Sequence, residues 1–128
     1  LNFQGSDMSS KILSVDDSAT VRLVLSTTLR DAGYEVIEAC DGQEALDYLD
    51  DGDINMLITD LNMPNVDGID LIRQVRRTSG FRFVPIIMLT TESEEEKKRE
   101  GKAAGASGWI LKPFKPEQLL AVVNMVMV

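Results

Sequence analysis

Short apolar segments alternate with longer amphipathic segments along almost the whole chain, and this alternation restricts the fold more than any other feature. The short segments have four or five residues, too few for a helix, and most are apolar enough for burial on both faces of a parallel sheet. The pattern therefore predicts an α/β fold with one parallel sheet and helices on both of its faces. The predicted strands are Lys11–Val15, Glu35–Ala39, Met56–Thr59, Pro85–Leu89 and Gly108–Leu111.

Five helices are predicted between and after these strands, because apolar residues recur there at helical spacing. The first carries such residues from Val21 to Leu29, with Ser18 as its expected N-cap and Gly33 as its stop signal. Three of the others are marked by Ala45, Leu46 and Leu49, by Ile69, Ile72 and Val75 after Gly68, and by Leu119, Leu120 and Val123 after Pro116.

The remaining helix, Glu94 to Ala104, differs because it has no large apolar residue to bury. Ion pairs of Glu94 with Lys98 and of Glu95 with Arg99 are expected to contribute about 0.2–0.5 kcal/mol each. Gly101 costs about 1 kcal/mol relative to alanine. We therefore expect this to be the weakest helix and its charged run to be mainly a solvated face.

Length and composition indicate a single domain. The chain has 128 residues, 44% of them hydrophobic, which suits one compact core. Residues 1–7 include Phe3-Gln4-Gly5-Ser6, which is typical of a cleaved expression tag, so the natural chain is predicted to begin at Met8.

The charge of the chain argues against two classes of partner. Its net charge of -8 disfavours direct binding to nucleic acid or to anionic membranes. No apolar run approaches the about 20 residues of a membrane span, and no secretory signal follows Met8. The lone Cys40 fits a reducing compartment, and we take it as structural or incidental. These features predict a cytoplasmic protein.

The chain contains no histidine. Its absence removes the commonest general base and every histidine-based metal site, so any chemistry must rely on carboxylates. A phosphohistidine, if the function needs one, must belong to a partner.

Reactive side chains follow four of the five predicted strands. In a parallel α/β sheet, ligands bind beyond the carboxyl ends of the strands, so these side chains are expected to meet at one edge. Taken singly, an acid pair is often a turn or a helix cap, a threonine bonds to backbone, and a lysine is solvated. Their joint placement favours a functional site. The residues are Asp16 and Asp17, Asp60, Thr90 and Thr91, and Lys112 with Pro113.

Three crowded carboxylates imply a cation that keeps them ionised. Because only oxygen ligands are available, Mg²⁺ is the natural choice. The ion would also orient Asp60 for attack on a phosphoryl group, while Lys112 and Thr90 hold further phosphate oxygens.

The motifs at these positions resemble the bacterial response-regulator receiver family, over essentially all of Lys11 to Val128. The resemblance is strongest to its stand-alone, CheY-like chemotaxis members. It implies a receiver domain over residues 8–128 and a flavodoxin-like (βα)5 fold with strand order 2-1-3-4-5, whereas the residue pattern alone indicates only a parallel α/β sheet. The motifs are Val15-Asp16-Asp17-Ser18, the run from Thr59 to Gly68, Leu89-Thr90-Thr91 and Lys112-Pro113-Phe114.

The resemblance also implies roles for individual residues. Asp60 is the expected phosphoacceptor, and Lys112 the expected partner of the phosphoryl group, toward which Thr90 moves. The implied Mg²⁺ ligands are Asp16, Asp17, Asp60 and the backbone carbonyl of Asn62.

The resemblance also implies features of a conformational switch and of dephosphorylation. The Lys112–Pro113 bond is expected to be cis. The switch aromatic falls on Trp109, where the prototype carries tyrosine; an indole is larger and only donates, so its inward swing is expected to be less complete or differently bonded. The alternative is that Trp109 is simply a packed strand aromatic. Asn62 and Glu92 occupy the positions that tune dephosphorylation.

By resemblance, the chain is a phosphorelay switch that catalyses only its own phosphorylation and slow dephosphorylation. A CheA-type histidine kinase is the expected phosphodonor. The expected partner is a FliM-like flagellar switch protein, another kinase or a phosphatase, and the domain is expected to be a monomer. The phosphoryl group would change the face formed by the fourth helix, fifth strand and last helix, and the polar fourth helix is hypothesised to be part of the switch.

Three alternatives remain open at this point. The domain could be a fragment of a longer regulator, since fold does not decide output. An aspartyl-nucleophile phosphohydrolase would use similar residues, but such enzymes usually carry a second acid where this chain has Asn62, and no cap domain is evident. A pure interaction module would not need the acids.

Overall fold

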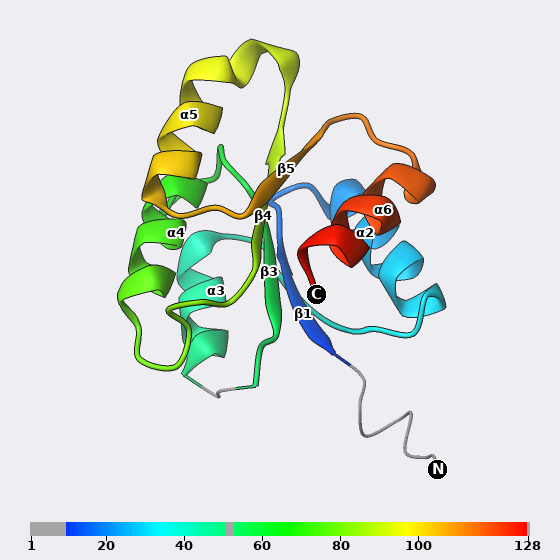
Figure 1. Cartoon of the computed structure of the whole chain (residues 1–128), viewed down its shortest axis with the longest axis horizontal. Coiled ribbons are helices and arrows are strands. Elements are labelled where there is room, and N and C mark those ends of the chain that lie inside the picture. Colours follow the sequence, from blue (N-terminus) through cyan, green and yellow to red (C-terminus); the bar gives the residue numbers. More distant parts are fainter. Residues whose placement is uncertain (1–9, 51–52, 128) are drawn as a thin grey trace.

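The computed structural model describes residues 10–50 and 53–127, which form a five-stranded sheet between two layers of helices (Figure 1). All neighbouring strands are parallel, and their order is β2-β1-β3-β4-β5. The flavodoxin-like order implied by the resemblance is thus confirmed. The predicted tag remnant, residues 1–7, lies outside the described residues. The strands are β1 (Lys11–Val15), β2 (Glu35–Ala39), β3 (Met56–Asp60), β4 (Ile86–Thr90) and β5 (Gly108–Leu111).

Helices α2 and α6 cover one face of the sheet, and α3, α4 and α5 cover the other (Figure 1). Strand residues alternate between the layers: Leu13 and Leu57 pack toward α3 and α4, whereas Ile12 and Ile58 pack toward α2 and α6. None of the described helices is long and apolar enough to cross a membrane. The helices are α2 (Ala19–Asp31), α3 (Gly42–Leu49), α4 (Gly68–Arg77), α5 (Glu95–Ala104) and α6 (Pro116–Val126), with a 3-10 turn, η1 (Glu92–Glu94), before α5.

The predicted helix signals act as expected at the start and end of α2. The Ser18 hydroxyl accepts a hydrogen bond from the Val21 N–H at 3.3 Å. Gly33, at φ 100°, follows the last turn, in a region that side chains rarely adopt. These two residues fix the length of the helix that begins directly after the acid pair.

Helix α5 buries no large apolar side chain, as predicted, but its predicted ion pairs are wrong. Lys98 pairs with Glu95 at 2.9 Å and Arg99 with Glu96 at 3.1 Å, both one residue closer in sequence than expected. Glu94 turns inward instead, where its two carboxylate oxygens accept hydrogen bonds from the Asn62 amide and the Thr91 N–H. The solvated face therefore begins only after Glu94.

Helix α5 is attached by the close approach of its backbone to β4 and by hydrogen bonds, instead of by a row of apolar side chains. A Cβ on Gly101 would lie 2.1 Å from the Met88 sulfur, so glycine allows the helix to settle onto β4. At the far end, the Arg76 guanidinium donates to the Gly105 carbonyl at 2.7 Å and to the Val84 carbonyl at 2.6 Å. Burial lowers the pKa of Arg76. The C-terminal end of α5 is thus fastened to α4 by a half-buried cation.

Gly68 determines how closely the start of α4 approaches Asp60. A Cβ on Gly68 would lie 2.1 Å from the backbone oxygen of Asp60. Backbone cannot move aside as the end of a flexible side chain can, so no other residue fits here without displacing the end of β3.

Gly68→Ala is therefore expected to lower the free energy of unfolding by about 1–3 kcal/mol, the usual cost of overpacking, although alanine is the better helix former. Urea denaturation measures this. The matched control is Gly108→Ala, whose nearest contact would be the Val126 side chain at an ordinary 3.4 Å. Equal stability of the two variants would contradict the close approach.

Candidate functional site

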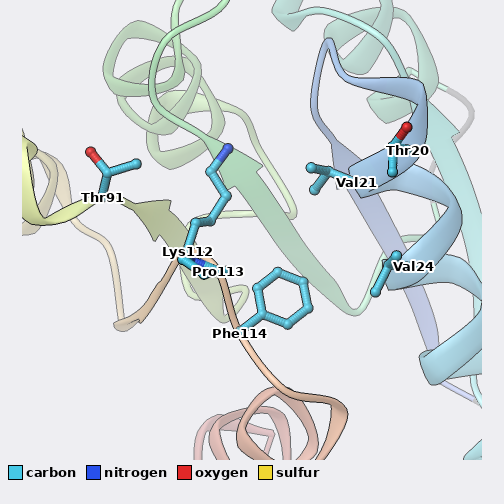
Figure 2. A pocket seen from close by; sticks show the side chains of 7 residues that line it. All are labelled: Thr20, Val21, Val24, Thr91, Lys112, Pro113 and Phe114. Carbon is cyan, nitrogen blue, oxygen red and sulfur yellow. The ribbon is translucent and has the colours of Figure 1, made fainter.

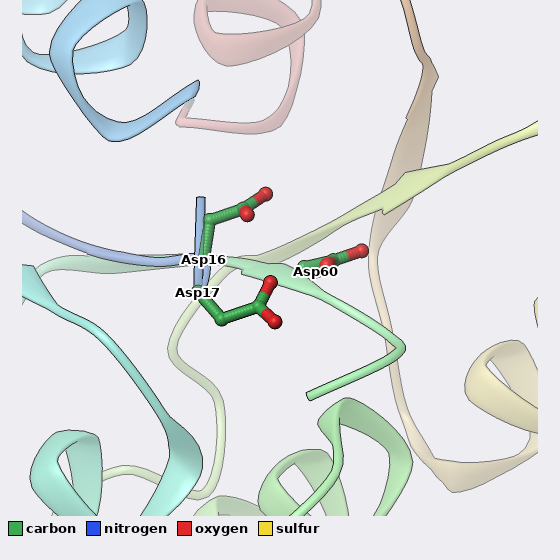
Figure 3. Close-up of side chains that lie close together, drawn as sticks. All are labelled: Asp16, Asp17 and Asp60. Carbon is green, nitrogen blue, oxygen red and sulfur yellow. The ribbon is translucent and has the colours of Figure 1, made fainter. Parts of the chain in front are cut away.

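The three predicted acids meet at the carboxyl edge of the sheet (Figure 3). Asp16 and Asp17 follow β1, and Asp60 ends the neighbouring β3. One carboxylate oxygen from each lies within 4.8 Å of the others. Asp16 and Asp60 are 0% and 5% exposed, whereas Asp17 is exposed. Two buried carboxylates thus lie beneath one that solvent reaches.

The turn that carries Asp16 and Asp17 is held from two sides. Asp16 Oδ1 accepts a hydrogen bond from the Ser18 N–H at 2.8 Å. Arg22 donates to the Asp16 carbonyl at 2.6 Å and lies 3.6 Å from the Glu38 carboxylate. We did not predict this role of Arg22, because a single arginine on an amphipathic helix gives no sequence signal for it.

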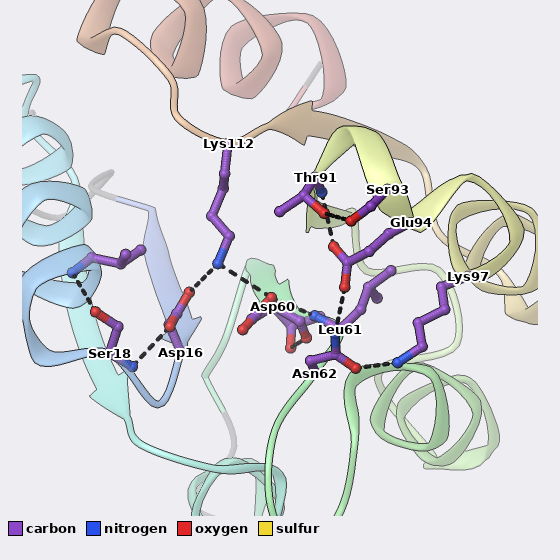
Figure 4. A network of polar contacts seen from close by, with 12 residues as sticks. Asp16, Ser18, Asp60, Leu61, Asn62, Thr91, Ser93, Glu94, Lys97 and Lys112 are labelled. Carbon is purple, nitrogen blue, oxygen red and sulfur yellow. Dashed lines mark hydrogen bonds and ion pairs between the residues drawn. The ribbon is translucent and has the colours of Figure 1, made fainter.

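Lys112 brings the positive charge that the sequence predicted at this edge (Figure 4). Its Nζ lies 3.3 Å from Asp16 Oδ2 and 3.4 Å from Asp60 Oδ1. The Lys112–Pro113 bond is cis, as the resemblance implied. Lys112 is therefore part of the acid cluster and not a solvated surface lysine.

Burial and repulsion make Asp60 hard to ionise. Burial raises the pKa of Asp60, the Asp16 carboxylate raises it further, and Lys112 only partly opposes them. Burial alone would lower the pKa of Lys112, but the charges of Asp60 and Asp16 together raise it. The cluster thus holds more negative charge than one lysine neutralises.

Thr90 supplies an uncommitted donor at the same edge. It ends β4 beside β3, is 1% exposed, and its hydroxyl has no hydrogen-bond partner among residues 10–50 and 53–127. A buried hydroxyl without a partner costs about 1–3 kcal/mol. This cost would be recovered if a ligand oxygen lay there.

The two positions that the resemblance links to dephosphorylation, Glu92 and Asn62, have different surroundings. Glu92 lies in η1 and is exposed. The Asn62 amide donates to Glu94 Oε2 at 2.6 Å and accepts from the Lys97 ammonium. Our sequence interpretation missed Glu94 and Lys97, although Glu94 follows Thr91 at the spacing of a capping box and its Oε1 accepts from the Thr91 N–H at 2.8 Å.

Trp109 lies at the surface against α5, and not in the core. Its side chain is 41% exposed, and the ammonium groups of Lys98 and Lys102 lie 4.6 and 4.3 Å from the ring centroid. Each such cation–π contact contributes about 0.5–1 kcal/mol at an exposed site. Trp109 is thus not a core aromatic, and its role as the switch residue stays a prediction.

A cavity of about 410 Å³ opens beside the acids, between the start of α2 and the segment after β5 (Figure 2). Its walls are mostly apolar, and its polar lining residues are Thr20, Thr91 and Lys112. Lys112, which lies beside Asp16 and Asp60, also forms part of the cavity wall. The cavity is lined by Thr20, Val21, Val24, Thr91, Lys112, Pro113 and Phe114.

The donor set fits a hard divalent cation. Asp16, Asp17 and Asp60 offer carboxylate oxygens within one coordination sphere, and no histidine or neighbouring thiol competes. A cation here would relieve the repulsion that raises the pKa of Asp60. The residues therefore suit Mg²⁺.

A parallel sheet in this order, with acids, a lysine and a threonine along its carboxyl edge, defines a receiver domain. Residues 12–124 match the response regulator receiver domain family, and the chain belongs to this family of two-component signalling proteins. It is similar to the chemotaxis protein CheY1 of Helicobacter pylori, with 44% identity over 91% of this chain and 96% of that protein.

Two solved structures are similar over almost their whole length. The chemotaxis protein CheY4 of Vibrio cholerae has 49% identity and a TM-score of 0.88, covering 92% of this chain and 98% of that one. The receiver domain of the sensor histidine kinase PA1611 from Pseudomonas aeruginosa has 28% identity and a TM-score of 0.86, covering 93% and 98%, and carries a magnesium ion in its active site cleft.

In metal-free protein at neutral pH, Asp60→Asn is expected to raise the melting temperature, because it removes a carboxylate whose ionisation is opposed by burial and Asp16. In the wild type, Asp60 does not destabilise the fold below the ordinary carboxyl pKa, because the group is protonated in both the folded and the unfolded state. Its full destabilising effect is present above the raised pKa of the folded state. The advantage of the variant should therefore vanish as the pH falls through this window.

Thermal melts from about pH 3 to about pH 8 in chelator check this expectation. Asp47→Asn, which changes an exposed acid of α3, serves as the matched control. An advantage of Asp60→Asn that does not vary with pH would mean that it does not come from the charge of Asp60.

Proposed function

We propose that this receiver domain is a chemotaxis signalling switch that is activated by phosphorylation of Asp60. The observation that carries the proposal is the grouping of a buried, hard-to-ionise Asp60 with two further carboxylates, the Lys112 ammonium and the unpartnered Thr90 hydroxyl. The similarity to CheY1 and CheY4 favours chemotaxis as its setting.

Asp16, Asp17, Asp60 and the backbone carbonyl of Asn62 would hold Mg²⁺. The magnesium in the PA1611 receiver domain supports this assignment. When bound, the ion supplies positive charge that keeps the carboxylates ionised and offsets the charge of an incoming phosphoryl group. The exposed side of the site, at Asp17, would admit it.

In the transfer step, an Asp60 carboxylate oxygen attacks the phosphorus of a phosphohistidine. The new O–P bond forms as the N–P bond breaks, and the imidazole leaves with the electron pair of that bond. Because this chain contains no histidine, the phosphohistidine belongs to a partner, a histidine kinase of the CheA type. Lys112 lies close enough to Asp60 to hold one phosphoryl oxygen after transfer.

The switch would then run from Thr90 to the face formed by α5, β5 and α6. The Thr90 hydroxyl gains a phosphoryl oxygen as its partner and draws the end of β4 toward Asp60. Trp109 leaves Lys98 and Lys102 and moves inward, which changes the surface offered to a FliM-like target, another kinase or a phosphatase. Asn62 and Glu92 would tune the slow loss of the phosphoryl group. The protein would act as a cytoplasmic monomer.

Incubation with a small-molecule phosphodonor and Mg²⁺ should add one phosphoryl group, and mass mapping should assign it to Asp60. The reaction should need a divalent cation, because the crowded carboxylates oppose an anionic donor. Asp60→Asn is the control and should remain unmodified. Label on another residue, or labelling in chelator, would overturn the proposal.

Trp109 is the only tryptophan, so its fluorescence reports the switch directly. Beryllium trifluoride, a phosphoryl mimic, should shift the emission to shorter wavelength in the presence of Mg²⁺, because the indole becomes less exposed. Lys102→Met removes one contact that holds the ring outward and should lower the mimic concentration at half-change by about twofold to fivefold. An unshifted spectrum in wild type that binds the mimic would contradict the inward movement.

A further inference from the structure

The N-terminal end of α5 is held by a polar link to the loop that follows Asp60 (Figure 4). Glu94 is only 9% exposed, and both of its carboxylate oxygens are used: Oε1 accepts from the Thr91 N–H at 2.8 Å and Oε2 from the Asn62 amide at 2.6 Å. Lys97, one turn further along α5, donates to the other end of the same amide. We call these three side chains, Asn62, Glu94 and Lys97, the Asn62 link.

The link continues to the phosphoacceptor through one residue. The Leu61 N–H donates to Asp60 Oδ1 at 2.8 Å, and Lys112 lies 3.4 Å from the same oxygen. Leu61 is buried, and a peptide bond joins it to Asn62, so a shift of the Leu61 backbone moves Asn62 as well. One hydrogen bond, the peptide bond between Leu61 and Asn62, and the Asn62 link thus join the Asp60 carboxylate to the start of α5.

Helix α5 depends on this link more than most helices would. It has no large apolar residue in the core, and the bonds from Arg76 hold only its other end. Its first turn is therefore attached by the buried Glu94 carboxylate, by Lys97 and by the contact of Lys98 with the Trp109 ring. A change that weakens the link should release that turn while Arg76 keeps the helix in place.

We propose that the Asn62 link couples occupation of the Asp60 site to the position of the α5 N-terminus, with Glu94 and Lys97 as positioning residues that act through Asn62. The inference rests on the proposed function. A phosphoryl group turns the Asp60 carboxylate into an acyl phosphate, which removes the negative charge of the carboxylate and weakens Oδ1 as an acceptor for the Leu61 N–H. The Leu61–Asn62 segment then moves, and the link is strained or broken.

Coupling of this kind is reciprocal. If occupation of the site weakens the link, cutting the link must raise the affinity of the site by the same factor. The unoccupied protein is thus held in its resting form by a contact that lies outside the acid cluster. This reciprocity separates a coupling role of Glu94 from a merely structural one.

The test uses Glu94→Gln, which keeps the size of the side chain but leaves one acceptor oxygen for two donors. Two quantities are measured: hydrogen exchange of residues 95–100 in the metal-free protein, and the affinity of the Mg²⁺-loaded protein for beryllium trifluoride. We expect exchange to become about tenfold faster and affinity about fivefold higher. Lys97→Met should act in the same direction with a smaller effect.

Glu96→Gln is the matched control, because it makes the same change on the same helix at a glutamate that pairs only with Arg99 on the solvent side. Faster exchange in Glu94→Gln with wild-type affinity would overturn the inference and leave Glu94 as a structural anchor. Wild type that does not bind the mimic with Mg²⁺ would instead overturn the proposed function, and the inference with it.

Discussion

Electrostatic crowding at the carboxyl edge of the sheet is the constraint on which the rest of the site depends. Two buried aspartates share one lysine, and burial together with mutual repulsion raises the pKa of Asp60. Such a cluster persists only if its backbone is fixed by other means. Arg22 holds the turn after β1, and Gly68 lets α4 pack against the backbone of Asp60. The packed core thus maintains a site whose charges oppose one another.

The parts of the structure that follow from periodicity and strand ends were predictable from sequence. Apolar runs place the strands, and a parallel sheet necessarily brings Asp16, Asp60 and Lys112 to one edge. The strand order came from the family resemblance, because many orders satisfy the same pattern. The inward turn of Glu94 was not predicted, since its partner Asn62 is 32 residues away and a run of charges suggests solvent. Only its spacing from Thr91 indicated a capping role.

The surroundings of Trp109 could not be predicted from the sequence either. Lys98 and Lys102 are four residues apart and therefore lie on one side of α5. Whether that side faces β5 depends on how the chain turns between the two elements, where Gly105 adopts φ 122° and Arg76 binds its carbonyl. The pairing of two cations with one indole is thus a product of tertiary structure. It joins the only tryptophan to the helix that the proposed switch would move.

The way α5 is attached also bears on how related receiver domains in one cell remain specific for different partners. A helix that is attached by a row of apolar side chains can change its outer residues only where the packing of that row allows it. Here attachment depends on Gly101 and on polar contacts at the two ends, through Glu94 and Arg76. The outward side chains between those ends can diversify without disturbing the core. Such a surface is well suited to acquire a distinct partner while the acid cluster stays the same.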